Sequence, residues 1–139
     1  MLYLLDIGDK KSKIMHGINT DFHFFFEYNE FDSPDEKGSY INMDVDFLNK
    51  LAEARKIASI AFKITSGYRT QKHNEKVGGV PSSSHTRGCA ADIYAPTSRQ
   101  KYIIINSLLQ VGFNRIGVAK NFIHVDSDAT KTEDVIWTY

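Results

Sequence analysis

The chain has 139 residues, 42% of them hydrophobic and 24% charged, which is ordinary for one globular domain. Basic and acidic residues balance at 17 each, so the net charge gives no reason to expect nucleic acid or an anionic membrane as a partner. The single cysteine, Cys89, excludes an internal disulfide, and its small neighbours lead us to expect a buried small hydrophobic residue there. No apolar run reaches the length of a membrane span, and the start lacks a basic leader. We therefore expect synthesis in the cytoplasm without a signal peptide.

The first 25 residues are the least readable part of the chain. We treat residues 1–25 as an N-terminal extension of uncertain role, followed by a main domain of residues 26–139. Two apolar stretches in this part, residues 3–7 and 22–26, predict short strands that pack against the main body.

Three helical segments are predicted beyond a short turn at residues 28–31. One begins near Asp44, whose carboxylate suits an N-cap, and its apolar residues recur at three- and four-residue steps up to residue 58. A short exposed helix follows at residues 70–76 and ends before two glycines. The third covers residues 98–111, where the following glycine is a natural stop.

Five segments alternate or are rich in β-branched residues, and these predict strands. They are residues 62–66, 90–94, 115–118, 122–126 and 135–139. Strands mixed with helices in this order predict a single α+β domain with a mainly antiparallel sheet flanked by helices.

Two histidines and one aspartate are the residues that suggest chemistry. His85 and Asp92 are separated by small residues that suit a loop feeding a strand, and His124 lies in an apolar strand further on. Two imidazoles and a carboxylate suffice for a catalytic zinc, which leaves a fourth position for water. Taken singly, each also fits an ordinary structural role: a satisfied core histidine or a turn aspartate. The spacing alone is less specific than two histidines on one helix face.

A series of short motifs, in a fixed order along the chain, resembles that of a known family. SGYR, HN, VGG, SxHxxGxAxD, GF, IG, FIHVD and a terminal Trp together resemble the M15 family of zinc D-Ala-D-Ala carboxypeptidases, over residues 31–137. More closely, the chain resembles the small subgroup of this family found in bacterial and phage genomes. The resemblance implies a compact α+β fold shared with lysostaphin-type and hedgehog-type zinc domains. It also implies one zinc ion bound by His85, Asp92 and His124, and cleavage of amide bonds in peptidoglycan stem peptides.

The same resemblance suggests roles near the metal. Arg69 takes the place of the SGYR arginine, and a fixed guanidinium can bind a substrate carboxylate or stabilise charge on the scissile carbonyl oxygen. Its alternative is a structural ion pair. Ser83 matches the serine of SxH and would hydrogen-bond substrate, or else stabilise its own loop.

The general base is where this sequence departs from part of the family. Several members carry Glu or Asp three residues before the last histidine ligand, where this chain has Asn121. Asp126 follows His124 by two residues, so in a strand it shares the face of His124 while Asn121 points away. We expect Asp126 to act as the general acid/base. The other role left open is to accept a hydrogen bond from a ligand imidazole and fix its tautomer.

The expected activity is therefore that of a zinc metallopeptidase, working as a carboxypeptidase or as an endolysin-type endopeptidase. The expected substrate is a peptidoglycan peptide, and the chain is expected to be a monomer that acts on the cell wall, as a phage lysin or virion component. Two alternatives are a zinc-containing cell-wall-binding module without turnover and a metal-free structural phage domain.

Overall fold

The computed structural model describes the chain from residue 2 to residue 139, and its side chains from residue 8 onward. Helices in chain order are α1 (Leu2–Gly17), α2 (Thr20–Phe25), α3 (Val45–Ala58), α4 (Gln71–Lys76) and α5 (Ser98–Gln110). Short 3-10 helices are η1 (Tyr28–Phe31), η2 (Ser39–Asn42) and η3 (Ser84–Arg87). The strands are β1 (Ile64–Ser66), β2 (Ala90–Tyr94), β3 (Arg115–Val118), β4 (Phe122–Asp126) and β5 (Val135–Thr138).

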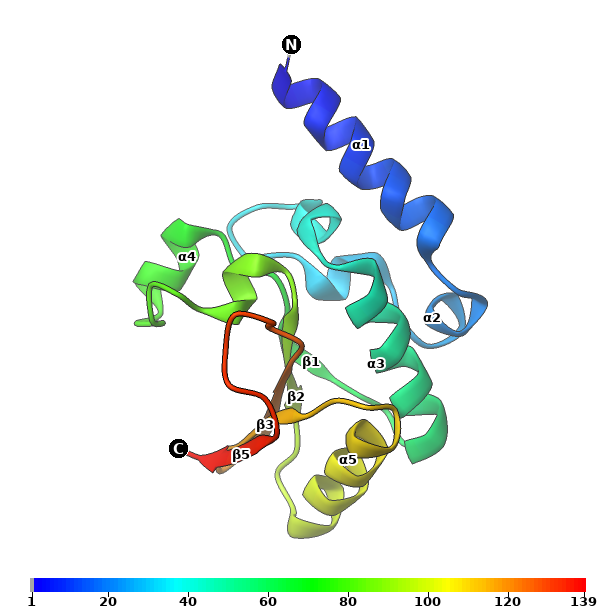
Figure 1. Ribbon diagram of the computed structural model, residues 1–139, viewed down its shortest axis with the longest axis vertical. Coiled ribbons are helices and arrows are strands. Elements are labelled where there is room, and N and C mark those ends of the chain that lie inside the picture. Colours follow the sequence, from blue (N-terminus) through cyan, green and yellow to red (C-terminus); the bar gives the residue numbers. More distant parts are fainter. Residues whose placement is uncertain (1) are drawn as a thin grey trace.

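The strands form one five-stranded sheet in the order β1-β2-β4-β3-β5. Neighbouring strands are antiparallel except β3 and β5, which are parallel. Helices α3 and α5 lie together on one side of the sheet (Figure 1). This confirms the predicted α+β class with a mainly antiparallel sheet flanked by helices.

Local sequence accounts for where the two long helices of the main body begin. Asp44 caps α3 by accepting a hydrogen bond from the amide of Phe47 at 2.9 Å. Thr97 and Gln100 form a capping box at the start of α5. Both starts agree with the sequence prediction within a residue, because caps depend on near neighbours in the chain.

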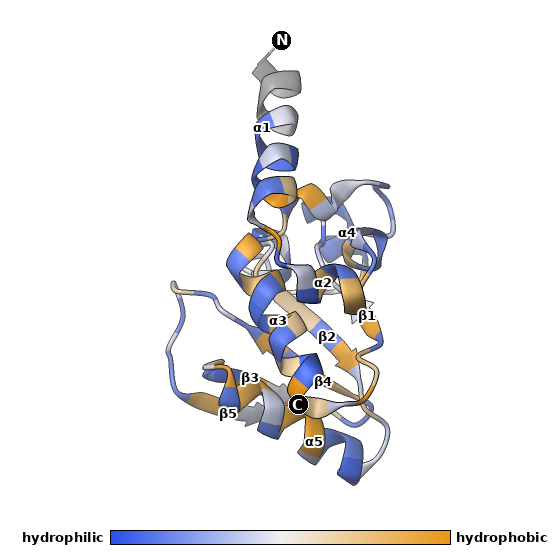
Figure 2. Cartoon of the chain, turned by 90° about the vertical axis from the view of Figure 1, so that its right-hand side faces the viewer, coloured by the Kyte–Doolittle hydropathy of each residue, from blue (hydrophilic) through white to orange (hydrophobic). Residues whose placement is uncertain are grey.

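The sheet has one apolar and one polar face. Ile93, Ile116, Ile123 and Val125 are fully buried in the core cluster, together with side chains of α3 and α5. Hydropathy colouring shows apolar stretches on these elements (Figure 2). Residues of the opposite face are paired across neighbouring strands in one row, which runs Ser66, Asp92, His124, Gly117 and Trp137. Because directly paired residues project to the same face, this row gathers the polar side chains into one place.

The two strands expected in the first 26 residues are wrong. Residues 3–7 lie within helix α1, and residues 22–25 lie within α2. Phe22 and Phe26 are buried in the core while Phe24 between them is 81% exposed. Four-residue spacing of the buried side chains matches a helical repeat, whereas a strand would have buried all three. Helix α1 itself projects from the rest of the chain (Figures 1 and 2).

Smaller differences concern the ends of the remaining strands. β1 is shorter than the expected 62–66 and has an irregular register between Ile64 and Ser66.

Within the described part of the chain, no helix has both the length and the apolar character needed to cross a membrane.

Candidate functional site

The polar face of the sheet opens into a cavity of about 330 Å³. The residues expected from the sequence to form the site all line it, namely Arg69, Ser83, His85, Asp92, His124 and Asp126. Asn121 precedes β4, is exposed and is not among the residues that line this cavity. Six side chains that span 58 positions of the sequence, from residue 69 to residue 126, thus meet in one place.

His85, Asp92 and His124 form a compact group of possible metal ligands. Their ligand atoms lie within 4.8 Å of one another, and all three residues are buried. Asp92 Oδ1 is 2.9 Å from His124 Nδ1 and 3.3 Å from His85 Nε2. Nitrogen and oxygen donors at these distances fit the donor set and spacing that zinc requires.

The backbone explains why the group converges. Asp92 on β2 is directly opposite His124 on β4 in the antiparallel ladder, so both side chains stand on the same face. His85 comes from η3, where the Ser83 hydroxyl accepts a hydrogen bond from the amide of His85. η3 is followed by Gly88, whose φ of +72° and close approach to Asn42 O leave no room for a Cβ.

Each histidine has one ring nitrogen occupied by a neighbour outside the metal group. His85 Nδ1 lies 2.8 Å from the carbonyl oxygen of Gly67 and donates to it, which leaves Nε2 for a metal. His124 Nε2 lies 2.8 Å from Asp126 Oδ2 and donates to it, which leaves Nδ1 beside Asp92. Such partners fix the tautomer and orientation of metal-binding imidazoles.

The electrostatics of the group reflect these contacts. Burial alone would raise the pKa of Asp92, but hydrogen bonds from His124 and His85 outweigh it and hold that pKa below its ordinary value. Burial alone would lower the pKa of His124, but its hydrogen bonds to Asp126 and Asp92 outweigh it and raise that pKa. A metal at Nδ1 binds the neutral imidazole, so metal binding competes with protonation of His124.

Asp126 is engaged through both carboxylate oxygens. Oδ2 accepts from His124, while Oδ1 accepts from Arg115 Nε at 2.7 Å and from the amide of Asp128 at 3.1 Å. Arg115 also donates to the Thr132 carbonyl. The Asp126 side chain is 1% exposed, so it forms a buried ion pair beneath the metal group.

An indole ring packs against this ion pair. The guanidinium of Arg115 lies 5.1 Å from the ring centroid of Trp137, and the ring centroids of His124 and Trp137 are 5.5 Å apart. Trp137 is paired with Gly117 on the neighbouring strand, and a Cβ on Gly117 would lie 2.8 Å from the indole. The glycine therefore makes the space in which the ring can contact His124.

Arg69 is held directly beside the metal group. Its guanidinium donates to Ser66 Oγ at 3.0 Å, to Asn74 Oδ1 at 3.3 Å and to Asp92 Oδ2 at 3.5 Å. Asn74 also donates to the carbonyl of Val80 at 2.7 Å, which ties this arginine to the loop over the cavity. Arg69 thus has a fixed position with its charge next to one candidate ligand.

Several residues that line the cavity were not identified from the sequence: Ser84, Arg115, Lys131 and Tyr139. Trp137 was noted only as part of a motif. Arg115 carried a usable signal, because it alternates with Gly117 in a predicted strand and so shares the face of His124 once the strands pair. Lys131 lies in the connection between β4 and β5, where no periodicity marks a side-chain direction.

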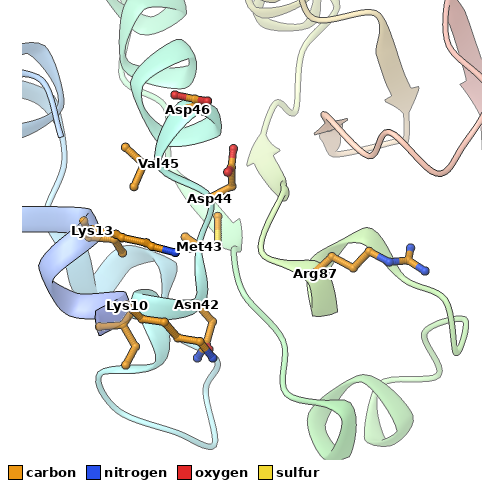
Figure 3. A pocket seen from close by; sticks show the side chains of 10 residues that line it. Lys10, Lys13, Asn42, Met43, Asp44, Val45, Asp46 and Arg87 are labelled. Atoms are coloured by element: carbon orange, nitrogen blue, oxygen red, sulfur yellow. The ribbon is translucent and has the colours of Figure 1, made fainter. Parts of the chain in front are cut away.

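A second, larger cavity lies elsewhere. It measures about 480 Å³ and is lined by residues of α1, the start of α3 and η3, among them Lys10, Lys13, Asp44 and Arg87 (Figure 3). Lysines of α1 and the aspartates that begin α3 both face it, so its charges are mixed. None of the candidate ligands lines this cavity, and the chemistry is therefore assigned to the smaller one.

One family of known proteins matches most of the chain. The family model described as peptidase M15 matches residues 25–126, and no curated protein matches the chain. The matched region contains the three residues of the metal group and the arginine beside them. Because this match covers most of the chain, the protein belongs to the M15 family of peptidases.

Proposed function

We propose that this protein is a zinc-dependent peptidase that hydrolyses amide bonds in the stem peptides of bacterial peptidoglycan. M15 peptidases are zinc-dependent, and this chain has a buried His85, Asp92 and His124 group that fits the metal. That group, lying against a fixed arginine in a cavity, is the observation that carries the proposal. Zinc held by these residues would polarise the substrate carbonyl and lower the pKa of bound water to roughly 7.

The surrounding residues have distinct proposed roles. Arg69 lies beside the ligand Asp92, where its guanidinium is placed to stabilise negative charge that develops on the scissile carbonyl oxygen. Ser83 lines the cavity and caps η3, so it holds His85 and offers a hydroxyl to the substrate. Neither side chain needs to reorganise during the reaction, because each is already fixed by hydrogen bonds within the protein.

Two roles were left open for Asp126: general acid/base, and acceptor of a hydrogen bond that orients His124. We propose the second. A general base must lie within hydrogen-bond reach of the water it activates. Both oxygens of Asp126 already accept hydrogen bonds from His124 and Arg115, in a side chain that is 1% exposed. Asp126 therefore fixes the tautomer of His124, so that Nδ1 is the atom presented to the metal.

The experiment is digestion of purified peptidoglycan, with products identified by mass spectrometry. We expect new peptide fragments with the zinc-loaded protein, none after chelation, and full recovery when zinc is restored. His124→Ala should release no fragments. His73→Ala is the matched control, since His73 lies on α4 and is not among the residues that line the cavity.

Intact muropeptides at high concentrations of zinc-loaded protein would contradict the proposed reaction. Retention of stoichiometric zinc in that case would identify a zinc-containing module that binds cell wall without turnover. The masses of the fragments also separate a carboxypeptidase, which releases a single terminal residue, from an endopeptidase, which cuts within the stem or cross-bridge.

A further inference from the structure

The charges around the cavity do not balance in equal pairs. Asp92 and Asp126 each face one arginine, Arg69 and Arg115 respectively. Asp128 instead faces two cations: Arg87 at 2.8 Å and Lys131 at 3.8 Å. The cluster around Asp128 therefore has a net positive charge at neutral pH.

Lys131 is the member of that cluster that lines the cavity beside Asp126 and the metal group. Its ammonium donates to Ser84 Oγ at 2.9 Å, and its side chain is 25% exposed. Arg87 has the shorter contact with Asp128 and also donates to the carbonyl of Ser82 at 3.0 Å. Arg87 thus makes the shorter ion pair with Asp128, and the ammonium of Lys131, which has three N–H donors, gives one of them to Ser84.

One hydrogen bond connects Lys131 to the segment that carries a candidate ligand. Ser84, its hydrogen-bond partner, directly precedes the ligand His85 in η3. Arg69 contacts a ligand itself, through Asp92, and its hydrogen bonds to Ser66 and Asn74 use its other nitrogens. Arg69 and Lys131 therefore line one cavity, Arg69 beside the ligand Asp92 and Lys131 beside the residue that precedes the ligand His85.

We propose that Lys131 binds a free carboxylate of the substrate adjacent to the scissile amide bond. This inference rests on the proposed peptidase function and narrows its substrate to peptides with such a carboxylate. An ammonium in a mostly buried wall forms a charge-assisted hydrogen bond with a carboxylate, and a neutral carboxamide gains much less from the same position. The carboxylate has two sources in a stem peptide: the chain end, or an in-chain α-carboxylate next to a γ-linkage.

The test uses two pairs of synthetic peptides on the zinc-loaded full chain. The first pair is a peptide that ends in D-Ala-D-Ala, as the free acid and as the C-terminal amide. The second contains a γ-linked D-Glu with its α-carboxyl free or amidated. Wild type, Lys131→Met, Lys131→Arg and the control Lys11→Met are compared by kcat and KM. Lys11 is exposed on α1 and gives the same change in net charge.

Wild type should prefer the acid of one pair over its amide by about tenfold or more in kcat/KM, and that pair identifies the source of the carboxylate. Lys131→Met should remove the preference, by raising KM for the acid much more than KM for the amide. Lys131→Arg should retain most of the preference, and Lys11→Met all of it. Zinc content and Tm measured on each preparation show that the site remains folded.

Cleavage of both pairs without any preference by wild type overturns the inference while leaving the peptidase function intact. So does a preference that survives in Lys131→Met. If wild type cleaves neither pair, the proposed function fails for these substrates, and calorimetric binding of the same peptides then decides. Tighter binding of an acid than of its amide, lost in Lys131→Met, supports carboxylate recognition, and equal binding rejects it.

Discussion

Asp126 accepts hydrogen bonds from two side chains that the metal site needs in fixed positions. Asp126→Asn keeps the size of the side chain and removes its charge. It weakens the contact with His124 and leaves the buried guanidinium of Arg115 without its counter-charge. We expect zinc affinity to fall about ten- to a hundredfold, because outer partners of metal-binding histidines have effects of that order. Competition with a chromogenic chelator measures the affinity, and a thermal melt measures the accompanying loss of stability.

The same variant separates this role from general base catalysis. A preparation that keeps wild-type zinc affinity while turnover falls by about a hundredfold or more would identify Asp126 as the base and reject the positioning role. Unchanged zinc affinity together with unchanged turnover would remove Asp126 from the mechanism. Asp9→Asn is the control, because Asp9 lies on α1 with its side chain 67% exposed.

At the scale of elements, strands β3 and β5 support the site through one close contact. Gly117→Ala places a methyl group 2.8 Å from the indole of Trp137, which must shift away from its position against His124. We expect the free energy of unfolding to fall by about 1–3 kcal/mol, as for other overpacked sites, with weaker zinc binding. Denaturant unfolding of the metal-free protein measures the first effect.

A matched glycine substitution tests whether the effect depends on this contact. Gly8 lies within helix α1, and a methyl group added there would meet no heavy atom within 4 Å, so Gly8→Ala should not destabilise the protein. Equal stability of Gly117→Ala and wild type would show that the indole does not need the space at Gly117.

The sequence predicts some elements better than others, because some depend on signals from near neighbours in the chain and others on contacts made only after folding. The bounds of β2, β3 and β4 match the prediction, since alternation and flanking turns are local signals. Helix α2 was missed because a run of aromatic residues shows no clear period until the core determines which side chains are buried. Lys131 and its partner Ser84 are 47 residues apart, and only the folded chain brings them together.

At the scale of the whole molecule, Asp128 joins the segment after β4 to η3. Burial alone would raise its pKa, but hydrogen bonds from Thr130, Ser84 and Arg87 outweigh it and hold the pKa well below its ordinary value. The unfolded chain therefore takes up a proton at higher pH than the folded chain does. The stability contributed by Asp128 is fully present above the unfolded pKa of about 3.9 and is lost as pH falls towards the folded pKa.

Urea unfolding between pH 7 and pH 3 measures this contribution. Wild type should lose stability as pH falls below about 4, with part of the loss due to Asp128. Asp128→Asn should start less stable at pH 7 and lose less over the same range. Curves that stay parallel for the two proteins would show that Asp128 has the same pKa in the folded and unfolded chains.

A metal bound by His85, Asp92 and His124 would link three elements, because these residues come from η3, β2 and β4. The unfolded chain does not hold these residues together, so zinc binds the folded state and stabilises it by mass action. Free zinc at about a hundred times its dissociation constant should add about 2.7 kcal/mol, equivalent to a rise in Tm of roughly 8 °C for a domain of this size. Calorimetry with zinc and with chelator measures the shift.

The variant His73→Ala should keep this shift in Tm, whereas His124→Ala should lose most of it, since two remaining ligands bind zinc far more weakly. A Tm that is the same with zinc and with chelator would show that the three side chains do not form a zinc site.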